Sequence, residues 1–322
     1  MTHTQLNGVL GGLLVLLFGI SLSVGDVPFS LLYTDPQLGW AVLETMRLPR
    51  TLLAILTGGF LGLTGATLQG FFRNPLADAG VIGIASAASF GSVLAISLGV
   101  STLFVPLWGL LGAALLLALL YYVLSKHPCM LTLILMGLGF NSLLMALTSL
   151  TLNLSDNPYK NLEIMFWLMG SFSHETLDVI FWSIPFLSMG FFILWRYRLA
   201  LNALSLGEDM AISLGYSMKK LIPMIIIGTA LCVGPLTALG GSIGFVGLIV
   251  PHLIRPYVSH KPSVLLLPSA LGGAVLCLMA DILIRCLPTQ TELKIGVITA
   301  LLGAPFFLYF AFTHKEKSHD PY

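Results

Sequence analysis

Charged side chains are scarce in this sequence of 322 residues. Asp, Glu, Lys and Arg make up 9% of it and hydrophobic residues 57%, whereas a typical soluble domain is about 25% charged. So few charged groups cannot cover a folded chain of this size in water, but a lipid bilayer accepts apolar surface. We therefore predict an all-α, polytopic membrane protein, which excludes soluble enzymes and secreted domains.

A strong excess of charge of either sign is also missing. The formal net charge is +1, so the chain offers no basic stripe for a phosphate backbone, and nucleic acid is not an expected partner. The cysteines lack the paired spacing of a metal site or a disulfide framework. We predict that all four are small buried hydrophobic residues: Cys129, Cys232, Cys277 and Cys286.

The nucleotide-binding pattern GxxxxGK[ST] is absent, so this chain is not expected to bind ATP through a P-loop. One catalytic pattern is present, because residues 240–244 read G-x-S-x-G with Ser242 in the nucleophile position. That motif requires a strand–turn–helix setting, whereas these residues fall between two predicted membrane helices. A serine hydrolase is therefore a minor alternative, and we expect a chain that is not an enzyme.

Apolar runs between polar, proline or glycine breaks predict about ten membrane helices in one domain, residues 1–322. A membrane helix needs about 20 apolar residues, and the third and eighth runs are short or rich in glycine, which indicates tilted, bent or shielded segments. The first seven residues contain no Lys or Arg, so we interpret the first run as a membrane helix and not as a signal peptide. The predicted helices cover residues 8–25, 51–70, 79–98, 103–124, 130–153, 177–195, 221–239, 243–258, 264–284 and 295–313.

Lys and Arg are divided unequally between the two sides of the predicted bundle. With the N-terminus in the cytoplasm, ten of them fall on the inner side and five on the outer side. The positive-inside rule therefore predicts that both termini are cytoplasmic. The loops are short, and the largest inner one runs from Arg196 to Leu221.

Residues 205–215 are the helix-like part of that inner loop. Ser205 and Glu208 make an S-x-x-E capping box, and Gly215 suits the position after a helix end. An apolar stripe is formed by residues four apart, Leu206, Met210 and Leu214. Such a stripe, without a local core, suits a groove on a partner protein. The alternative is a helix that lies on the lipid headgroups.

Residues 73–78 read Arg-Asn-Pro-Leu-Ala-Asp and follow the second predicted helix. Asn74 can cap a helix and Pro75 fits the first helical position, so we predict that the third helix begins there. A capped helix start is enough to explain these residues. The functional alternative is a constriction at the cytoplasmic mouth.

Small residues recur four apart along the second predicted helix, and the spacing is repeated where the eighth begins. Small residues let membrane helices approach closely, so the pattern favours packing, and a pathway wall is the alternative. The residues are Gly58, Gly62, Ala66 and Gly70, then Gly240, Gly244 and, three residues on, Gly247. Gln69 in the same stretch is a further candidate, because polar groups inside a membrane are costly.

Charged residues gather near the predicted outer ends of two helices. Asp281 and Arg285 are four apart, so they can pair on one helical face. Arg47 and Arg50 flank Pro49 where the second predicted helix starts. These arginines are either membrane anchors that extend to the interface or contacts for an acidic partner.

Five blocks of the sequence resemble, in family order, the permease subunits of the iron-complex/vitamin B12 family of ABC importers. Together they cover much of the chain from residue 47 to residue 310, whereas the first 40 residues and the loop 154–176 match weakly. Ala79 and Lys294 stand where proline is common in the family. The blocks are RLPRTLLAILTGGFLGLTGATLQGFFRNPLADAGVIG (47–83), LSLGEDMAISLG (204–215), GSIGFVGLIVPHLIR (241–255), LLPSALGGAVLCLMADILIR (266–285) and ELKIGVITALLGAPFFLYF (292–310).

The resemblance implies a homodimer of ten-helix subunits with the pathway on the two-fold axis, two ATPase subunits and a periplasmic or lipid-anchored substrate-binding protein. ATP and Mg²⁺ would bind the ATPase subunits, and this chain would hold no cofactor or metal. The resemblance also implies a coupling helix within about residues 199–220, a cytoplasmic gate and docking arginines. The residues are Ser205, Leu206, Gly207, Glu208, Asp209, Met210, Leu214 and Gly215 for coupling, Asn74, Pro75 and Leu76 for the gate, and Arg47, Arg50 and Arg285 for docking.

The cargo that the resemblance implies is an iron complex, either haem or a ferric siderophore, carried across a bacterial inner membrane. Residues 72–78, Phe-Arg-Asn-Pro-Leu-Ala-Asp, are closer to the iron-complex and haem members. Vitamin B12 is the main alternative. An ion-coupled secondary transporter is less favoured, because such carriers place charged residues at mid-membrane in broken helices, and here most charges lie at the helix ends.

Overall fold

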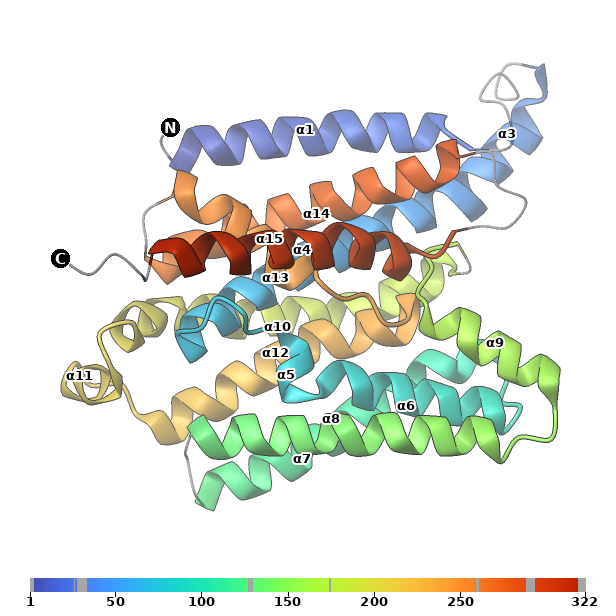
Figure 1. Cartoon of the computed structure of the whole chain (residues 1–322). Helices are drawn as coiled ribbons and strands as arrows, with labels where there is room; N and C mark the ends of the chain where they lie inside the picture. The colour runs from blue at the N-terminus through green and yellow to red at the C-terminus, as the bar shows by residue number, and fades with distance from the viewer. Residues whose placement is uncertain are drawn as a thin grey trace.

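A computed structural model gives the structure of residues 3–25, 27, 34–126, 130–173, 175–258, 261–287 and 293–317 (Figure 1). Every regular element within these ranges is a helix, which confirms the predicted all-α class.

Seven helical stretches are long and apolar enough to cross a membrane. One of them is continuous through three elements, α3 (Pro36–Val42), the π-turn η1 (Leu43–Arg47) and α4 (Leu48–Phe72), and another joins the short 3₁₀ turn η2 (Thr102–Phe104) to α7 (Val105–Lys126). The remaining five are single helices: α1 (His3–Ser23), α8 (Met130–Asn153), α10 (Leu177–Leu204), α12 (Met218–Gly240) and α14 (Pro262–Cys286).

The third predicted membrane helix is broken, the eighth is short, and the tenth counts as a shorter apolar helix over Ile295–Phe306. The third is split into α5 (Ala79–Ile82) and α6 (Ile84–Ser97) by Gly83, whose φ of +81° is readily accessible to glycine. The eighth is α13 (Val246–Ile254), extended by the 3₁₀ turn η3 (Arg255–Tyr257), and the tenth lies in α15 (Ile295–Lys317). The expected bending of the third segment is therefore confirmed, and ten crossings stay a prediction.

The two ends of the bundle carry different short helices. α11 (Glu208–Ser213) lies at the end where α1 begins and α15 ends, and α9 (Pro158–Leu168) and α3 lie at the opposite end (Figure 1). We call these the α11 end and the α9 end. Because the chain starts and finishes at the same end, the arrangement agrees with an even number of crossings.

Two predicted helix boundaries are wrong. The second helix begins at Pro36, so half of the predicted outer loop before Arg50 is helical, and α10 runs on to Leu204, so the inner loop is shorter than predicted. The apolar run marks only the length that lipid covers. The backbone hydrogen-bond ladder continues through polar residues until the chain reaches a residue that breaks it.

The cysteine prediction holds for two residues. Cys232 and Cys277 are buried in the bundle, whereas Cys286 is exposed because it is the last residue of α14. Burial of Cys286 was therefore a wrong expectation, and Cys129 lies outside the described residues.

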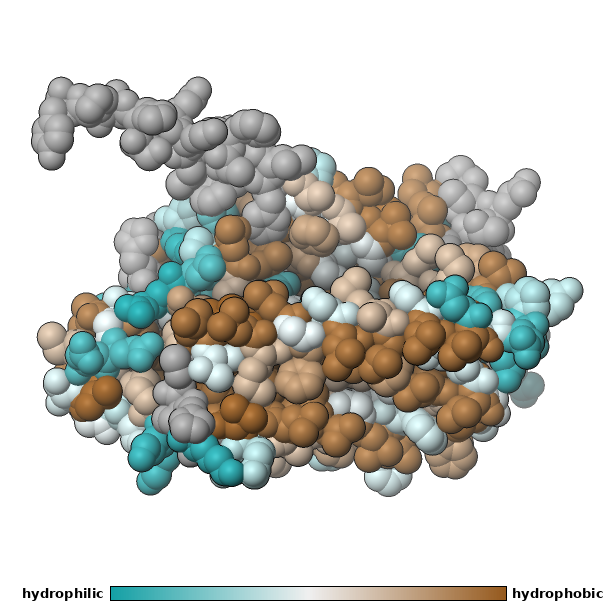
Figure 2. All heavy atoms as spheres, turned by 60° about the horizontal axis from the view of Figure 1, so that its bottom comes forward, coloured by the Kyte–Doolittle hydropathy of each residue, from teal (hydrophilic) through white to brown (hydrophobic). Residues whose placement is uncertain are grey.

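The side of the bundle formed by α7 and α8 is apolar. Figure 2 shows hydrophobic residues along this side and hydrophilic residues gathered towards the two ends. The exposed hydrophobic residues of these two helices include Leu111 and Leu115 on α7 and Leu131 and Leu135 on α8. Exposed apolar side chains between polar ends are the pattern that a bilayer stabilises.

The small-residue stripe on α4 faces α14. A Cβ atom at Gly58 would overlap the carbonyl oxygen of Gly273, and one at Gly62 would overlap the carbonyl oxygen of Ser269. Ala66 is fully buried on the same helix. The absence of side chains therefore lets the two backbones touch, as small residues do in membrane proteins.

A different glycine of α4 receives α13. A Cβ at Gly65 would overlap the carbonyl oxygen of Gly247, and one at Gly247 would lie 2.9 Å from the carbonyl oxygen of Leu61. By contrast, a Cβ at Gly244 would meet no atom within 4 Å. Gly244 is thus not a packing contact among the described residues, and α4 is the helix on which both α13 and α14 rest.

We predict that Gly62→Ala destabilises the protein and that its neighbour Gly59→Ala does not. Both changes give the same gain in helix propensity, about 1 kcal/mol, but the new methyl group overlaps backbone only at position 62. At Gly59 the nearest atom, the oxygen of Ala270, would be 3.6 Å away. Thermal unfolding in detergent should show a loss of about 1–3 kcal/mol for Gly62→Ala alone. Equal shifts for the two variants would contradict the account of the α4–α14 contact.

Candidate functional site

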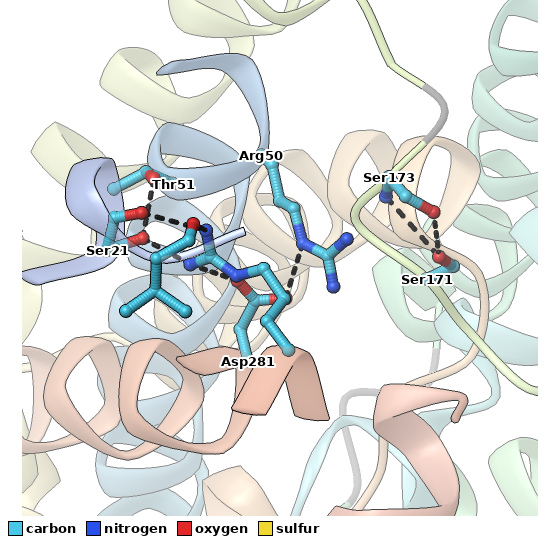
Figure 3. Close-up of polar contacts among 8 residues, drawn as sticks. Ser21, Arg50, Thr51, Ser171, Ser173 and Asp281 are labelled. Carbon is cyan, nitrogen blue, oxygen red and sulfur yellow. Dashed lines mark hydrogen bonds and ion pairs between the residues drawn. The ribbon is translucent and has the colours of Figure 1, made fainter. Parts of the chain in front are cut away.

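Two arginines pair with one carboxylate at the α9 end, and a third, Arg47, lines the same cavity beside them. Nε of Arg50 donates to Oδ1 of Asp281 at 2.8 Å, and Nη2 of Arg285 lies 2.8 Å from Oδ2. Figure 3 shows the Arg50 side chain of α4 reaching down to Asp281. The Asp281 side chain is 1% exposed, and burial is tolerated because both of its oxygens face a guanidinium. The predicted pairing of Asp281 with Arg285 is confirmed.

Two of these arginines also close the C-terminal end of α1. Arg285 donates to the carbonyl oxygens of Ser21 and Val24 and to the hydroxyl of Ser21, and Arg47 donates to the carbonyl oxygens of Leu22 and Val27. The last carbonyls of a helix lack partners within it and carry partial negative charge. Arg47 and Arg285 therefore fix α1 against the rest of the bundle.

Arg47, Arg50 and Arg285 line the same small cavity. Its volume is about 120 Å³, and Ser173 and Met46 complete part of its wall. The Arg47 residue is 7% exposed and belongs to a helical turn, not to the start of a helix as expected. The site predicted for docking is thus a recess with guanidinium walls rather than a set of arginines that stand out from the surface.

The predicted coupling segment forms a shorter helix than expected. α11 has six residues and begins after Gly207, whose φ is +113°. The capping box is wrong, because the hydroxyl of Ser205 donates to the carbonyl oxygen of Asn202 and ends α10 instead. Gly215, with φ +91°, follows the helix end as predicted.

The apolar side chains of this segment point away from the bundle. Leu206, Met210 and Leu214 are 68%, 49% and 58% exposed, whereas Ala211 between them is fully buried. Glu208 and Asp209 occupy the first turn of α11, where acidic side chains are favoured by the helix dipole. α11 therefore presents an apolar surface while Ala211 holds it to the body of the protein.

The predicted gate residues form a turn and do not start a helix. Oδ1 of Asn74 accepts from the backbone N–H of Leu76 at 2.9 Å, and Asp78 caps α5 by accepting from Gly80. The prediction that Asn74 caps the third helix is thus wrong. Asn74 makes this local turn because its short side chain bonds the backbone two residues on. Burial raises the pKa of Asp78. Leu76 is exposed, and Pro75 lies within the same turn.

Gln69 has a partner for each end of its side chain. Nε2 donates to the carbonyl oxygens of Gly247 and Leu248, both at 3.2 Å, and Oε1 accepts from Arg255 at 2.7 Å. The oxygen of Gly247 needs a donor from outside α13, because the residue four positions on is Pro251, which has no N–H. Gln69 supplies that donor, so it connects the last turn of α4 to α13.

A larger cavity of about 660 Å³ lies beneath α9. Glu163, Glu175 and Lys294 line it together with Trp167 and the ends of neighbouring helices. Burial raises the pKa of Glu175 to about 7. Within the part of the chain that the structure describes, no group of three His, Cys, Asp or Glu residues could hold a metal ion.

The residues around Ser242 do not form the elements that a serine hydrolase requires. Gly240 ends α12, and the segment from Gly241 to Phe245 connects it to α13 without any strand. Ser242 therefore does not lie on the strand–turn–helix elbow that this chemistry requires.

One family model and three related proteins indicate the family of this chain. A model of the FecCD transport family matches residues 9–313. The molybdate import system permease protein of Haemophilus influenzae is 38% identical, over 92% of this chain and 91% of the relative. The cobalamin import system permease protein of Halobacterium salinarum is 36% identical, over 85% and 74%. The hemin transport system permease protein of Yersinia pestis is 32% identical, over 86% and 85%.

Solved structures agree with these matches. The chain is similar to a metal-chelate type ABC transporter in an inward-facing conformation, with a TM-score of 0.87 and 35% identity, over 97% of this chain and 99% of the other. It shares its fold with a chain of the PsaBC complex of Streptococcus pneumoniae, with a TM-score of 0.57 and 18% identity, over 86% and 93%.

We predict that Asp281→Asn strongly destabilises the protein. It would leave two buried guanidiniums facing a neutral amide, and removing one partner of a buried ion pair costs about 3–5 kcal/mol. Asp178→Asn is the matched control, because Asp178 is exposed in the first turn of α10. Thermal unfolding in detergent should separate the two variants clearly. If Asp281→Asn is as stable as the control, the arginine cluster does not hold α1, α4 and α14 together.

Proposed function

Because the chain belongs to the FecCD transport family, it is an ABC importer permease of the inner membrane, and we propose that it carries an iron complex, either haem or a ferric siderophore, into the cytoplasm. The single observation that best supports the coupling part of this proposal is the apolar surface of α11, which has no partner within the described part of this chain. Two ATPase subunits that bind ATP and Mg²⁺, a second copy of this permease and a substrate-binding protein complete the proposed assembly.

The orientation follows from this assembly. The α11 end faces the cytoplasm and the ATPase subunits, and the α9 end faces the binding protein. Leu76 of the two permeases would narrow the cytoplasmic mouth, with Asn74 and Pro75 holding the turn that carries it. Gly244 has open space around it, which supports a position on the pathway or at the subunit interface.

The cargo is proposed at a finer level than the family. The relatives named for hemin, cobalamin and molybdate transport are 32%, 36% and 38% identical to this chain, so identity does not separate these substrates. Each of the three named substrates contains a metal. Identification of the ligand that co-purifies with the cognate binding protein tests the proposal. Haem or a ferric siderophore would support it, and vitamin B12 or molybdate would replace it without changing the transport mechanism.

We predict that Met210→Asp separates the permease from its ATPase. A carboxylate in an apolar groove cannot be solvated, so association should weaken by about tenfold or more. Substrate uptake and transport-stimulated ATP hydrolysis should fall together while membrane insertion is retained. The matched control is Met165→Asp on α9, a methionine of similar exposure at the opposite end of the bundle, which should leave association with the ATPase unchanged. Normal uptake by Met210→Asp would show that α11 is not the coupling surface.

We also predict that the arginine-lined cavity receives an acidic side chain of the binding protein. Arg50 is the arginine to change, because Arg47 and Arg285 also hold α1. Arg50→Gln should weaken docking about tenfold at low salt, or ~1.4 kcal/mol, and make docking less dependent on salt, since charge pairs at a rim chiefly set association rate and salt dependence. Lys160→Gln, at the same end on α9, is the control. A salt dependence in Arg50→Gln equal to that of the unaltered protein would identify these arginines as structural.

A further inference from the structure

Three helices touch at Gly70, in the last turn of α4. A Cβ at Gly70 would lie 2.8 Å from Cβ of Pro262, the first residue of α14, and 3.6 Å from Cβ of Leu201 on α10. Leu201 is fully buried. Glycine at this position therefore lets the end of α10 and the start of α14 pack directly against α4.

Asn202 joins two of these helices by a pair of hydrogen bonds. Its Nδ2 donates to Oγ of Ser263 at 2.8 Å, and its Oδ1 accepts from the backbone N–H of Ser263 at 2.9 Å. The residue before α14, Lys261, makes no side-chain capping bond, and Pro262 has no N–H to offer. Asn202 thus provides from α10 the cap that α14 lacks in its own sequence.

The coupling residues begin at Ser205, three positions after Asn202. The carbonyl oxygen of Asn202 accepts from the hydroxyl of Ser205, and the N–H groups of Leu206 and Gly207 donate to Ala203 and Leu204 at 3.1 and 2.9 Å. The chain is therefore hydrogen-bonded without a gap from the last turn of α10 to the residue before α11. A displacement of α11 must act on this turn.

The gate turn begins at Asn74, four positions after Gly70. The N–H of Asn74 donates to the carbonyl oxygen of Gln69 at 3.1 Å, and Arg73, in the left-handed conformation, ends α4. At its far end, α14 carries Asp281, which is paired with Arg50 of α4. If the start of α14 moves, the end of α4 that carries the gate turn should therefore move with it, and so should the Arg50–Asp281 pair at the opposite end.

We propose that Asn202 is a positioning residue that makes α14 and the gate turn follow the movement of the coupling segment. Packed helices respond to force as rigid bodies, and the bonded pair prevents α10 from sliding past the start of α14. The inference rests on the proposed function, because it presumes that an ATPase moves α11.

The decisive variants change the bonded pair and leave α11 intact. Asn202→Leu removes both hydrogen bonds at similar volume. Asn202→Asp keeps an oxygen that accepts from Ser263, and its charge is favoured at the start of α14. Ser263→Ala deletes one oxygen and keeps the backbone bond. Asn153→Leu, at the end of α8, is the matched control for the asparagine-to-leucine change.

The measurement is the amount of substrate imported per ATP hydrolysed by the complete complex in proteoliposomes. Asn202→Leu should assemble with basal ATP hydrolysis within about twofold of the unaltered complex and import about tenfold less per ATP. Ser263→Ala should fall by about threefold, and Asn202→Asp and Asn153→Leu should be close to normal. In a background of Leu76→Cys, nucleotide should change cross-linking between the two permeases, and Asn202→Leu should abolish that change.

A normal import per ATP in Asn202→Leu would overturn the inference. If this normal ratio arises from an equal loss of import and hydrolysis, the role of Asn202 is structural only. If Asn202→Leu does not assemble, import per ATP is compared in Ser263→Ala instead. A normal import per ATP in Ser263→Ala would then contradict the inference. Absence of ATP-driven import by the unaltered complex would instead overturn the proposed function, and this inference with it.

Discussion

The direct contact between the backbones of α4 and α14 is the constraint on which the rest of the structure depends. Gly58 and Gly62 allow it by leaving room for the backbone of Gly273 and Ser269. In a membrane, apolar side chains gain little by leaving lipid for protein, so close packing and polar contacts must hold helices together. Once α4 and α14 touch along their length, both ends of the pair are fixed in relation to each other.

Polar contacts then attach the surrounding helices to this pair. At the α9 end, Asp281 holds Arg50 and Arg285, and Arg285 closes α1. At the α11 end, Gln69 satisfies the carbonyl oxygen of Gly247 that Pro251 leaves without a donor. These buried polar groups hold helices together, so an intramembrane polar residue in this chain is not by itself a transport residue.

Local features of the structure could be predicted from the sequence. The membrane class follows from composition, the small residues on α4 from their spacing, and the Asp281–Arg285 pair from its separation of four residues. The resemblance added the α11 segment and the turn at residues 73–78 as regions of interest. The small-residue packing and the Asp281–Arg285 pair were predicted correctly because each depends on residues that are close in the chain.

Contacts between distant residues could not be predicted in the same way. Arg50 and Asp281 are 231 positions apart, and Asn202 and Ser263 are 61 apart, so no spacing in the sequence pairs them. The capping predictions failed for a related reason. Ser205 and Asn74 have the right residue types, but a nearby glycine or proline allows another turn, and the helix starts two or more residues later. The second helix and α10 were predicted too short because hydropathy stops where lipid stops.

The central claim is that ATP hydrolysis on partner subunits drives substrate through a pathway formed by this chain. Its most direct test is uptake into proteoliposomes that contain the permease with its cognate ATPase and binding protein. The account predicts that substrate accumulates only when ATP and Mg²⁺ are present on the ATPase side, whether or not an ion gradient is imposed. Uptake driven by an ion gradient, without the ATPase subunits, would contradict it.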